Sequence, residues 1–132
     1  MRSLGLFAFI AITIALTSCE GETTYLKKVE NNSNYPMWVY VGYNATSTND
    51  STYIDPHTSE TIHVTTQRGG NSNSVPCLDA FESIRVGLQD SLVLIKSIED
   101  EGNWTQEIVK QNKRGSLVQQ SCFFTVTSED FE

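Results

Sequence analysis

Two histidines are the side chains in this chain best suited to metal binding or to general acid/base catalysis. His57 and His63 are the only histidines, and acidic residues flank both. A metal site normally needs three or four ligands that reach one point in space. A hairpin that turns near Thr58 would place His63 opposite Tyr53 rather than opposite His57. The pattern therefore predicts two solvated histidines, no metal site and no cofactor.

The sequence motifs of common enzymes are absent. The chain contains no nucleophile-elbow, zincin or phosphate-loop pattern. Its serines are abundant, but a Ser/His/Asp set can be imagined from almost any chain of such composition. The adjacent acids Glu99, Asp100 and Glu101 are typical of a solvated turn rather than of a calcium or acid/base site. We therefore expect no catalytic residue and a protein that is not an enzyme, with an unrecognised hydrolase as the remaining alternative.

The N-terminal segment is built like an export signal that ends in a cysteine. Arg2 precedes an apolar core from Leu4 to Leu16, which is too short to span a bilayer. The following residues, Leu16-Thr17-Ser18-Cys19, resemble the lipobox of bacterial lipoproteins. A plain signal peptide with an incidental cysteine is the alternative.

The lipobox resemblance implies a defined division of the chain. Residues 1–18 are expected to be a cleaved lipoprotein signal peptide, and Cys19 is expected to carry the lipid. Residues 19–24 then form a lipidated tether for a folded domain at 25–132. Two or more acyl chains anchor a protein stably, so we expect a protein lipid-anchored in the cell envelope, at the periplasmic or surface face of the outer membrane.

Two cysteines remain besides the anchor. In an oxidising envelope, Cys77 and Cys122 are expected to form a disulfide. Closing a loop of this length stabilises a fold by roughly 4 kcal/mol in the chain-entropy model. Two buried free thiols are the alternative.

The charge balance limits the possible partners. Lys and Arg number 9 against 16 Asp and Glu, so the formal net charge is −7. Such a surface repels nucleic acid and anionic lipid head groups. We expect a protein or a glycan as the partner instead.

The aromatic residues are the best candidates for recognition. Exposed aromatic side chains can stack on sugar rings or anchor a protein partner. They can equally fill the core of a β-sandwich, which is about 10 Å thick. We assign Trp38 or its alternating neighbours to the core and consider Trp104 and Tyr43 as possible recognition aromatics.

The hydrophobic patterning predicts short strands separated by turn residues, and no strong amphipathic helix. Asn31 to Asn34 and Asp55 to Ser59 have the composition of turns. Residues 104–110 fit either a short helix or a short strand. About seven strands predict a single antiparallel β-sandwich. The clearest segments are 25–30, 37–43, 52–54, 60–66, 81–88, 92–98 and 117–127. We expect 81–88 and 92–98 to form a hairpin.

Several of these segments also resemble a known group of proteins. Val29 to Ser33, Tyr35 to Tyr43, Ile54-Asp55-Pro56 and the ending Phe123 to Phe131 resemble small uncharacterised lipoproteins of the Bacteroidota. The resemblance implies an Ig-like or transthyretin-like sandwich and carries no catalytic motif. We therefore expect a non-enzymatic envelope module that binds a protein or a glycan. The alternative is a structural accessory subunit of an envelope assembly.

Overall fold

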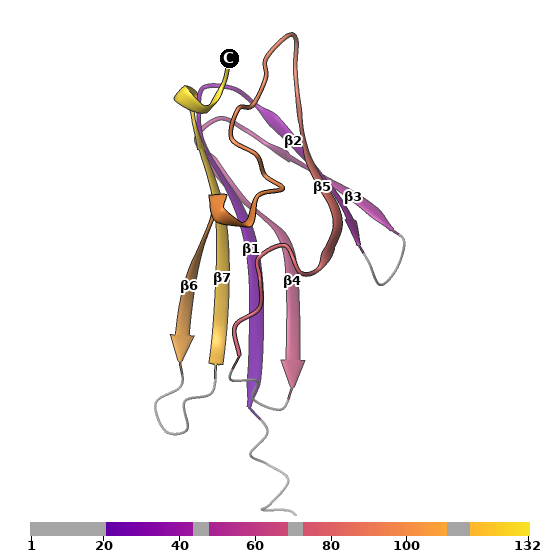
Figure 1. Ribbon diagram of the computed structural model, residues 1–132, viewed down its shortest axis with the longest axis vertical. Coiled ribbons are helices and arrows are strands. Elements are labelled where there is room, and N and C mark those ends of the chain that lie inside the picture. The colour runs from indigo at the N-terminus through magenta and orange to yellow at the C-terminus, as the bar shows by residue number, and fades with distance from the viewer. Residues whose placement is uncertain (1–20, 44–47, 69–72, 111–116) are drawn as a thin grey trace, which may run out of the picture.

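The structure is a computed structural model that describes residues 21–43, 48–68, 73–110 and 117–132. The regular secondary structure of these residues is strand, apart from two short 3₁₀ helices, η1 and η2 (Figure 1). The elements are β1 (Glu22–Asn32), β2 (Met37–Tyr43), β3 (Asn49–Ile54), β4 (Thr58–Arg68), β5 (Phe81–Leu88), η1 (Glu101–Asn103), β6 (Trp104–Lys110), β7 (Leu117–Thr127) and η2 (Ser128–Asp130). The expected all-β class is confirmed.

Two sheets pack face to face as a sandwich. One has the strand order β4-β1-β7-β6 and the other the order β3-β2-β5, and the strands of the second run obliquely to those of the first (Figure 1). The strand pairs are antiparallel, as predicted, with one exception: β1 and β7 are parallel. These strands come from opposite ends of the domain, so the larger sheet is complete only when both ends are in place.

One face of β1 supplies the inner surface of the larger sheet. Burial alternates along the strand from Thr23 to Asn31. Val29 lies opposite Phe124, and Asn31 lies opposite Val126. Because opposed residues point to the same side of a sheet, β1 and β7 present one continuous buried surface.

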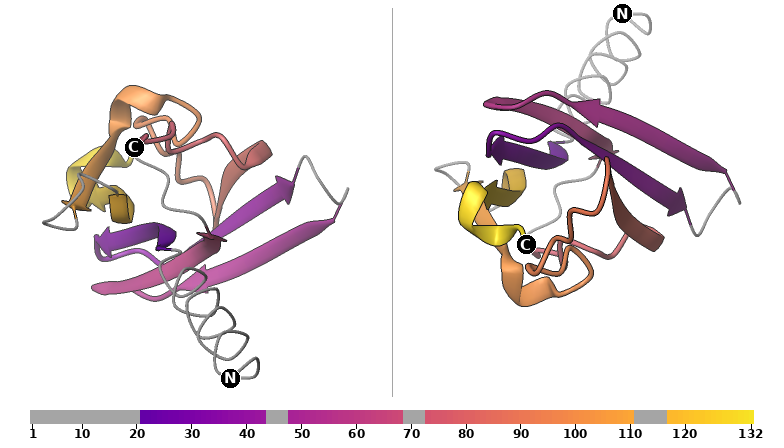
Figure 2. Two further views of the ribbon diagram at one scale, coloured as in Figure 1. Left: turned by 90° about the horizontal axis from the view of Figure 1, so that it is seen from below. Right: turned by 90° about the horizontal axis from the view of Figure 1, so that it is seen from above.

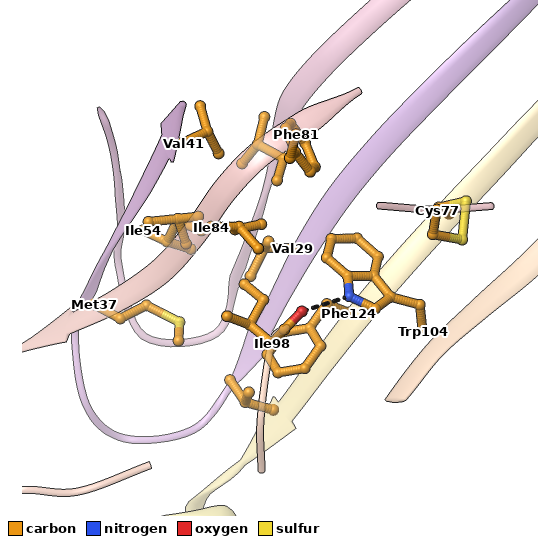
Figure 3. Packing of buried hydrophobic residues seen from close by; sticks show 14 residues of the cluster. Val29, Met37, Val41, Ile54, Cys77, Phe81, Ile84, Ile98, Trp104 and Phe124 are labelled. Atoms are coloured by element: carbon orange, nitrogen blue, oxygen red, sulfur yellow. Dashed lines mark hydrogen bonds between the residues drawn. A yellow bond between two sulfur atoms is a disulfide. The ribbon is translucent and has the colours of Figure 1, made fainter. Parts of the chain in front are cut away.

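The core fills the space between the two sheets. Val29 and Phe124 belong to one buried cluster with Met37, Ile54 and Ile84 of the smaller sheet (Figure 3). Each of these five side chains is no more than 3 % exposed. Burying one aliphatic or aromatic side chain stabilises a fold by about 1.5–3 kcal/mol, so this cluster holds the sheets together.

A buried asparagine joins the turns at one end of the sandwich. Nδ2 of Asn31 donates to the backbone oxygens of Tyr35 at 2.8 Å and Asp55 at 3.2 Å. Its Oδ1 accepts from the backbone N–H of Ser33 at 3.1 Å. The predicted turn residue therefore links the β1–β2 connection to the β3–β4 connection, which runs from one sheet to the other.

Residues 92–98 do not form the predicted hairpin with 81–88. Val93 exchanges two backbone hydrogen bonds with Glu132, both 2.9 Å long, and Ile95 donates to the oxygen of Asp130 at 2.9 Å. Figure 2 shows this segment beside the C-terminal end. The segment is not a strand either: its one β-bridge joins Leu94 to Phe131. Its backbone partner is the end of the chain.

The other strand predictions are largely confirmed. β2, β5 and β7 have the predicted bounds, while β1, β3 and β4 extend beyond them. β1 begins at Glu22, inside the segment expected to be a tether. Residues 104–110, whose sequence fits either a short helix or a short strand, form β6, which pairs with β7.

The predicted disulfide between Cys77 and Cys122 is present, with Cα atoms 5.7 Å apart. Next to it, the backbone N–H of Val75 donates to Oε1 of Gln120 at 2.9 Å, and Nε2 of Gln120 donates back to the Val75 oxygen at 2.6 Å. Gln120 and Cys122 are buried residues of β7. Residues 75–77, which precede β5, are therefore fixed to the inner face of the larger sheet.

Candidate recognition surface on the three-stranded sheet

The three-stranded sheet has one buried and one outward face, and β2 shows which residues belong to each. Met37, Val39 and Val41 are at most 4 % exposed, so they face the core. Successive side chains of a strand point to opposite sides. Trp38 and Tyr40 therefore lie on the side that faces away from the core.

The strand register assigns the rest of this outward surface, which we call the outer face. Its residues form three rows of three across β3, β2 and β5. The rows are Tyr53–Trp38–Gly87, Ser51–Tyr40–Arg85 and Asn49–Gly42–Ser83. One end of the outer face is thus aromatic, and the other end carries small polar side chains.

The aromatic end is exposed and tightly associated. Trp38 is 38 % exposed and Tyr53 is 40 % exposed. The ring centroids of Trp38 and Tyr53 are 5.0 Å apart, and those of Trp38 and Tyr40 are 6.3 Å apart with planes only 24° from parallel. Because each ring packs on its neighbour, the cluster can meet a ligand without first losing much side-chain freedom.

Arg85 is the one charged side chain among the nine positions of the outer face. Its guanidinium carbon lies 3.9 Å from the centroid of the Tyr40 ring. Among the described residues no carboxylate pairs with this guanidinium. A guanidinium held on an aromatic ring retains donors for a planar anion such as carboxylate or phosphate.

Gly87 makes room for the aromatic rings. A Cβ atom at this position would lie 2.7 Å from Cε2 of Tyr40 and 3.6 Å from Cβ of Trp38. Any larger residue at Gly87 must therefore displace the Tyr40 ring. The glycine lets Tyr40 and Trp38 lie against the sheet.

Trp104 and Tyr43, the two aromatics considered for recognition, do not lie on the outer face. Trp104 is 6 % exposed, and its indole N–H donates to the backbone oxygen of Ile98 at 2.9 Å (Figure 3). The hydroxyl of Tyr43 donates to the oxygen of Ile62 at 3.3 Å, and its ring packs on Phe81. Trp104 is thus part of the core, and Tyr43 is partly buried against it. Trp38, for which we expected a place in the core unless its alternating neighbours took that place, is exposed instead.

A second unusual feature is a buried cation on the inner face of the larger sheet. Lys27 is 3 % exposed, and its Nζ lies 4.8 Å from the centroid of the Phe81 ring. Burial lowers the pKa of Lys27 below its ordinary value, an effect that the charges of Asp79 and Glu101 oppose. The Glu101 carboxylate itself accepts the backbone N–H groups of Cys77 and Leu78.

The histidines do not form a joint site. His63 lies opposite Lys27 rather than opposite Tyr53, because β3 and β4 belong to different sheets. Burial lowers the pKa of His63, and the Lys27 charge adds to the effect. His57 contacts Oδ1 of Asn34 at 3.0 Å. Within the described ranges, no group of three or more His, Cys, Asp or Glu side chains could hold a metal ion.

The predicted lipid attachment site lies outside the described residues, as does the signal peptide at 1–18. In the described part of the chain, no helix has the length and apolar character needed to cross a membrane.

No protein-family model matches the chain, and neither does any curated protein or solved structure.

Proposed function

We propose that this protein is a lipid-anchored, non-enzymatic binding module of the cell envelope, held at the outer membrane through Cys19, and that it binds a protein or a glycan through the outer face. The observation that carries the proposal is the cluster of Trp38, Tyr40 and Tyr53 on the side of the sheet away from the core.

The exposure of these rings needs a physical explanation. Two large aromatic side chains left more than a third exposed forgo part of the roughly 1.5–3 kcal/mol that full burial of each would supply. A contiguous aromatic patch on a monomer typically marks a surface that a partner covers. Trp and Tyr are also the residues that contribute most often to binding hot spots.

A binding comparison tests this proposal. Trp38→Ala removes the central ring of the outer face, and Tyr35→Ala serves as the control because Tyr35 is 37 % exposed but packs on Phe131 instead. Wild-type and variant proteins are used to capture partners from solubilised envelopes and are also applied to a glycan array. We expect the wild type and Tyr35→Ala to retain the same partner and Trp38→Ala to lose it. Equal binding by all three proteins, or no partner for any of them, would contradict the proposal.

A structural role in an envelope assembly is the second candidate, and a different surface favours it. Val93 and Ile95 are 57 % and 56 % exposed. Val93 lines a groove of about 380 Å³ between the 92–98 segment and β5, an edge strand of its sheet. Exposed apolar residues beside an edge strand suit packing against a neighbouring subunit.

Paired substitutions separate the two candidates. For a structural subunit, Val93→Glu combined with Ile95→Glu would remove the protein from large complexes in native gels, whereas Trp38→Ala would leave it there. The binding-module proposal predicts that the double variant still binds the partner captured by the wild type.

A further inference from the structure

The dimensions of the outer face limit what it can bind unaided. Neighbouring strands are about 4.8 Å apart, and alternate residues along a strand are about 6.7 Å apart, so three rows of three span roughly 13 Å by 10 Å. A stable protein interface covers about 800 Å² on each partner, several times this area. The outer face is instead the size of a short oligosaccharide.

The chemistry across the outer face also suits a sugar. Trp38 and Tyr53 offer ring surfaces on which the C–H face of a sugar can pack. The hydroxyl groups of Ser51 and Ser83 form no hydrogen bonds with described residues, so they are available to sugar hydroxyls. The glycine at position 87 adds no side chain next to Trp38 that would lift a flat ligand off the ring.

Arg85 narrows the choice of sugar. It lies diagonally across from Trp38 on the neighbouring strand, a separation of about 7–8 Å. At that separation, a glycan whose sugar ring stacks on Trp38 can place an acidic group of the same sugar, or of the next one, against Arg85. Because the guanidinium is already positioned by Tyr40, pairing with a planar anion requires little reorganisation.

We infer that the ligand of the outer face is a glycan with acidic sugars, stacked on Trp38 and Tyr53 and paired through its carboxylate or phosphate with Arg85. The inference rests on the proposed binding function and specifies its ligand class.

Because the net charge of the protein is −7, its attraction for an acidic glycan must come from the short-range contact with Arg85. Long-range repulsion between an acidic protein and an acidic glycan is screened beyond about 8 Å at physiological ionic strength, whereas a contact pair is screened much less. Binding of a short acidic oligosaccharide should therefore persist as salt is raised from low to physiological concentration. An affinity that depended on diffuse attraction would fall steeply instead.

The experiment uses a glycan array in which each acidic oligosaccharide is paired with its carboxyl-reduced or dephosphorylated counterpart. The wild-type domain should bind acidic members more tightly than their neutral partners. Arg85→Met, which keeps the aliphatic stem over Tyr40, should reduce acidic binding about tenfold and abolish the preference. Arg85→Lys keeps the charge but loses the fork geometry, so it should retain part of the preference. Tyr35→Ala is the control and should bind as the wild type does.

The possible results distinguish a failure of the acidic-glycan inference from a failure of the proposed binding function. Equal binding of acidic and neutral partners, unchanged by Arg85→Met, would overturn the acidic preference and leave the binding function standing. Capture of a protein through Trp38, with no glycan bound, would overturn the glycan class alone. No ligand on the array and no captured protein would overturn both.

Discussion

At the scale of single residues, the sandwich carries two features that folding alone does not favour. One is the exposed Trp38 on the outer face, next to a glycine that gives its neighbouring ring room. The other is Lys27, a buried cation with a phenylalanine ring as its close contact. Aromatic exposure reduces the gain from hydrophobic burial, and a buried charge loses hydration.

The buried lysine leads to a prediction about pH and stability. The pKa of Lys27 is lower in the folded protein than its ordinary value of 10.5. Below the folded pKa the full cost of burying the charge is present, and as pH rises from the folded pKa towards 10.5 the cost disappears. Lys27→Met should therefore increase the free energy of unfolding by about 1 kcal/mol at pH 7, with a smaller gain near pH 10.

Urea unfolding at both pH values measures this effect. Lys28→Met, at the next and less buried position of β1, controls for the general loss of a positive charge from an acidic protein. A loss of stability in Lys27→Met at pH 7 relative to this control, or a gain independent of pH, would contradict the account.

At the scale of elements, the strands themselves follow local pattern, while their partners depend on distant residues. β2, β5 and β7 were predictable because their runs of β-branched and aromatic residues end at clear turn signals. The partner of residues 92–98 was not, because it lies at the C-terminus and no local pattern encodes it.

The outer face likewise could not be predicted from the pattern of one strand. Both sets of alternating residues on β2 are apolar, so the strand alone does not reveal that Trp38 faces outward. The signal lies in the neighbours: Ser83, Arg85 and Gly87 alternate with Ile84 and Val86 on β5. Such a set of small and polar residues marks an open face, but register is needed to place Trp38 on it.

The disulfide gives a prediction at this scale. It joins residues 45 apart and fixes the segment that precedes β5 to β7. Replacing both Cys77 and Cys122 by alanine should lower the free energy of unfolding by roughly 4 kcal/mol, chiefly because the unfolded chain is no longer constrained. Denaturant unfolding measures the loss, and mass spectrometry without reductant should show the two cysteines linked in the wild type. Free-thiol alkylation at both, or a stability change below about 1 kcal/mol, would contradict this assignment.

At the scale of the whole molecule, the proposal is a small acidic domain held close to a membrane. The lipid anchor at Cys19 is a prediction from the sequence. A short tether would keep the outer face within reach of ligands in the same envelope layer, which raises their effective concentration.

The anchor prediction is tested in cells. Cys19→Ala should release the protein in soluble form and stop its labelling with a fatty acid, because lipid attachment needs the thiol. Fractionation and metabolic lipid labelling measure both effects, with Ser18→Ala as the control because a small residue remains before the cysteine. Membrane retention of Cys19→Ala, or full-length protein with residues 1–18 intact and no lipid, would contradict the anchor.

The central claim is that a partner covers the outer face, and side-chain footprinting tests it most directly. The protein is exposed to hydroxyl radicals with and without a partner fraction that it captures, and oxidation is read for each aromatic residue. We predict that Trp38 and Tyr53 become protected on binding while Tyr35 does not change. Protection confined to Val93, Ile95 or other residues, with Trp38 oxidised equally in both samples, would contradict the account.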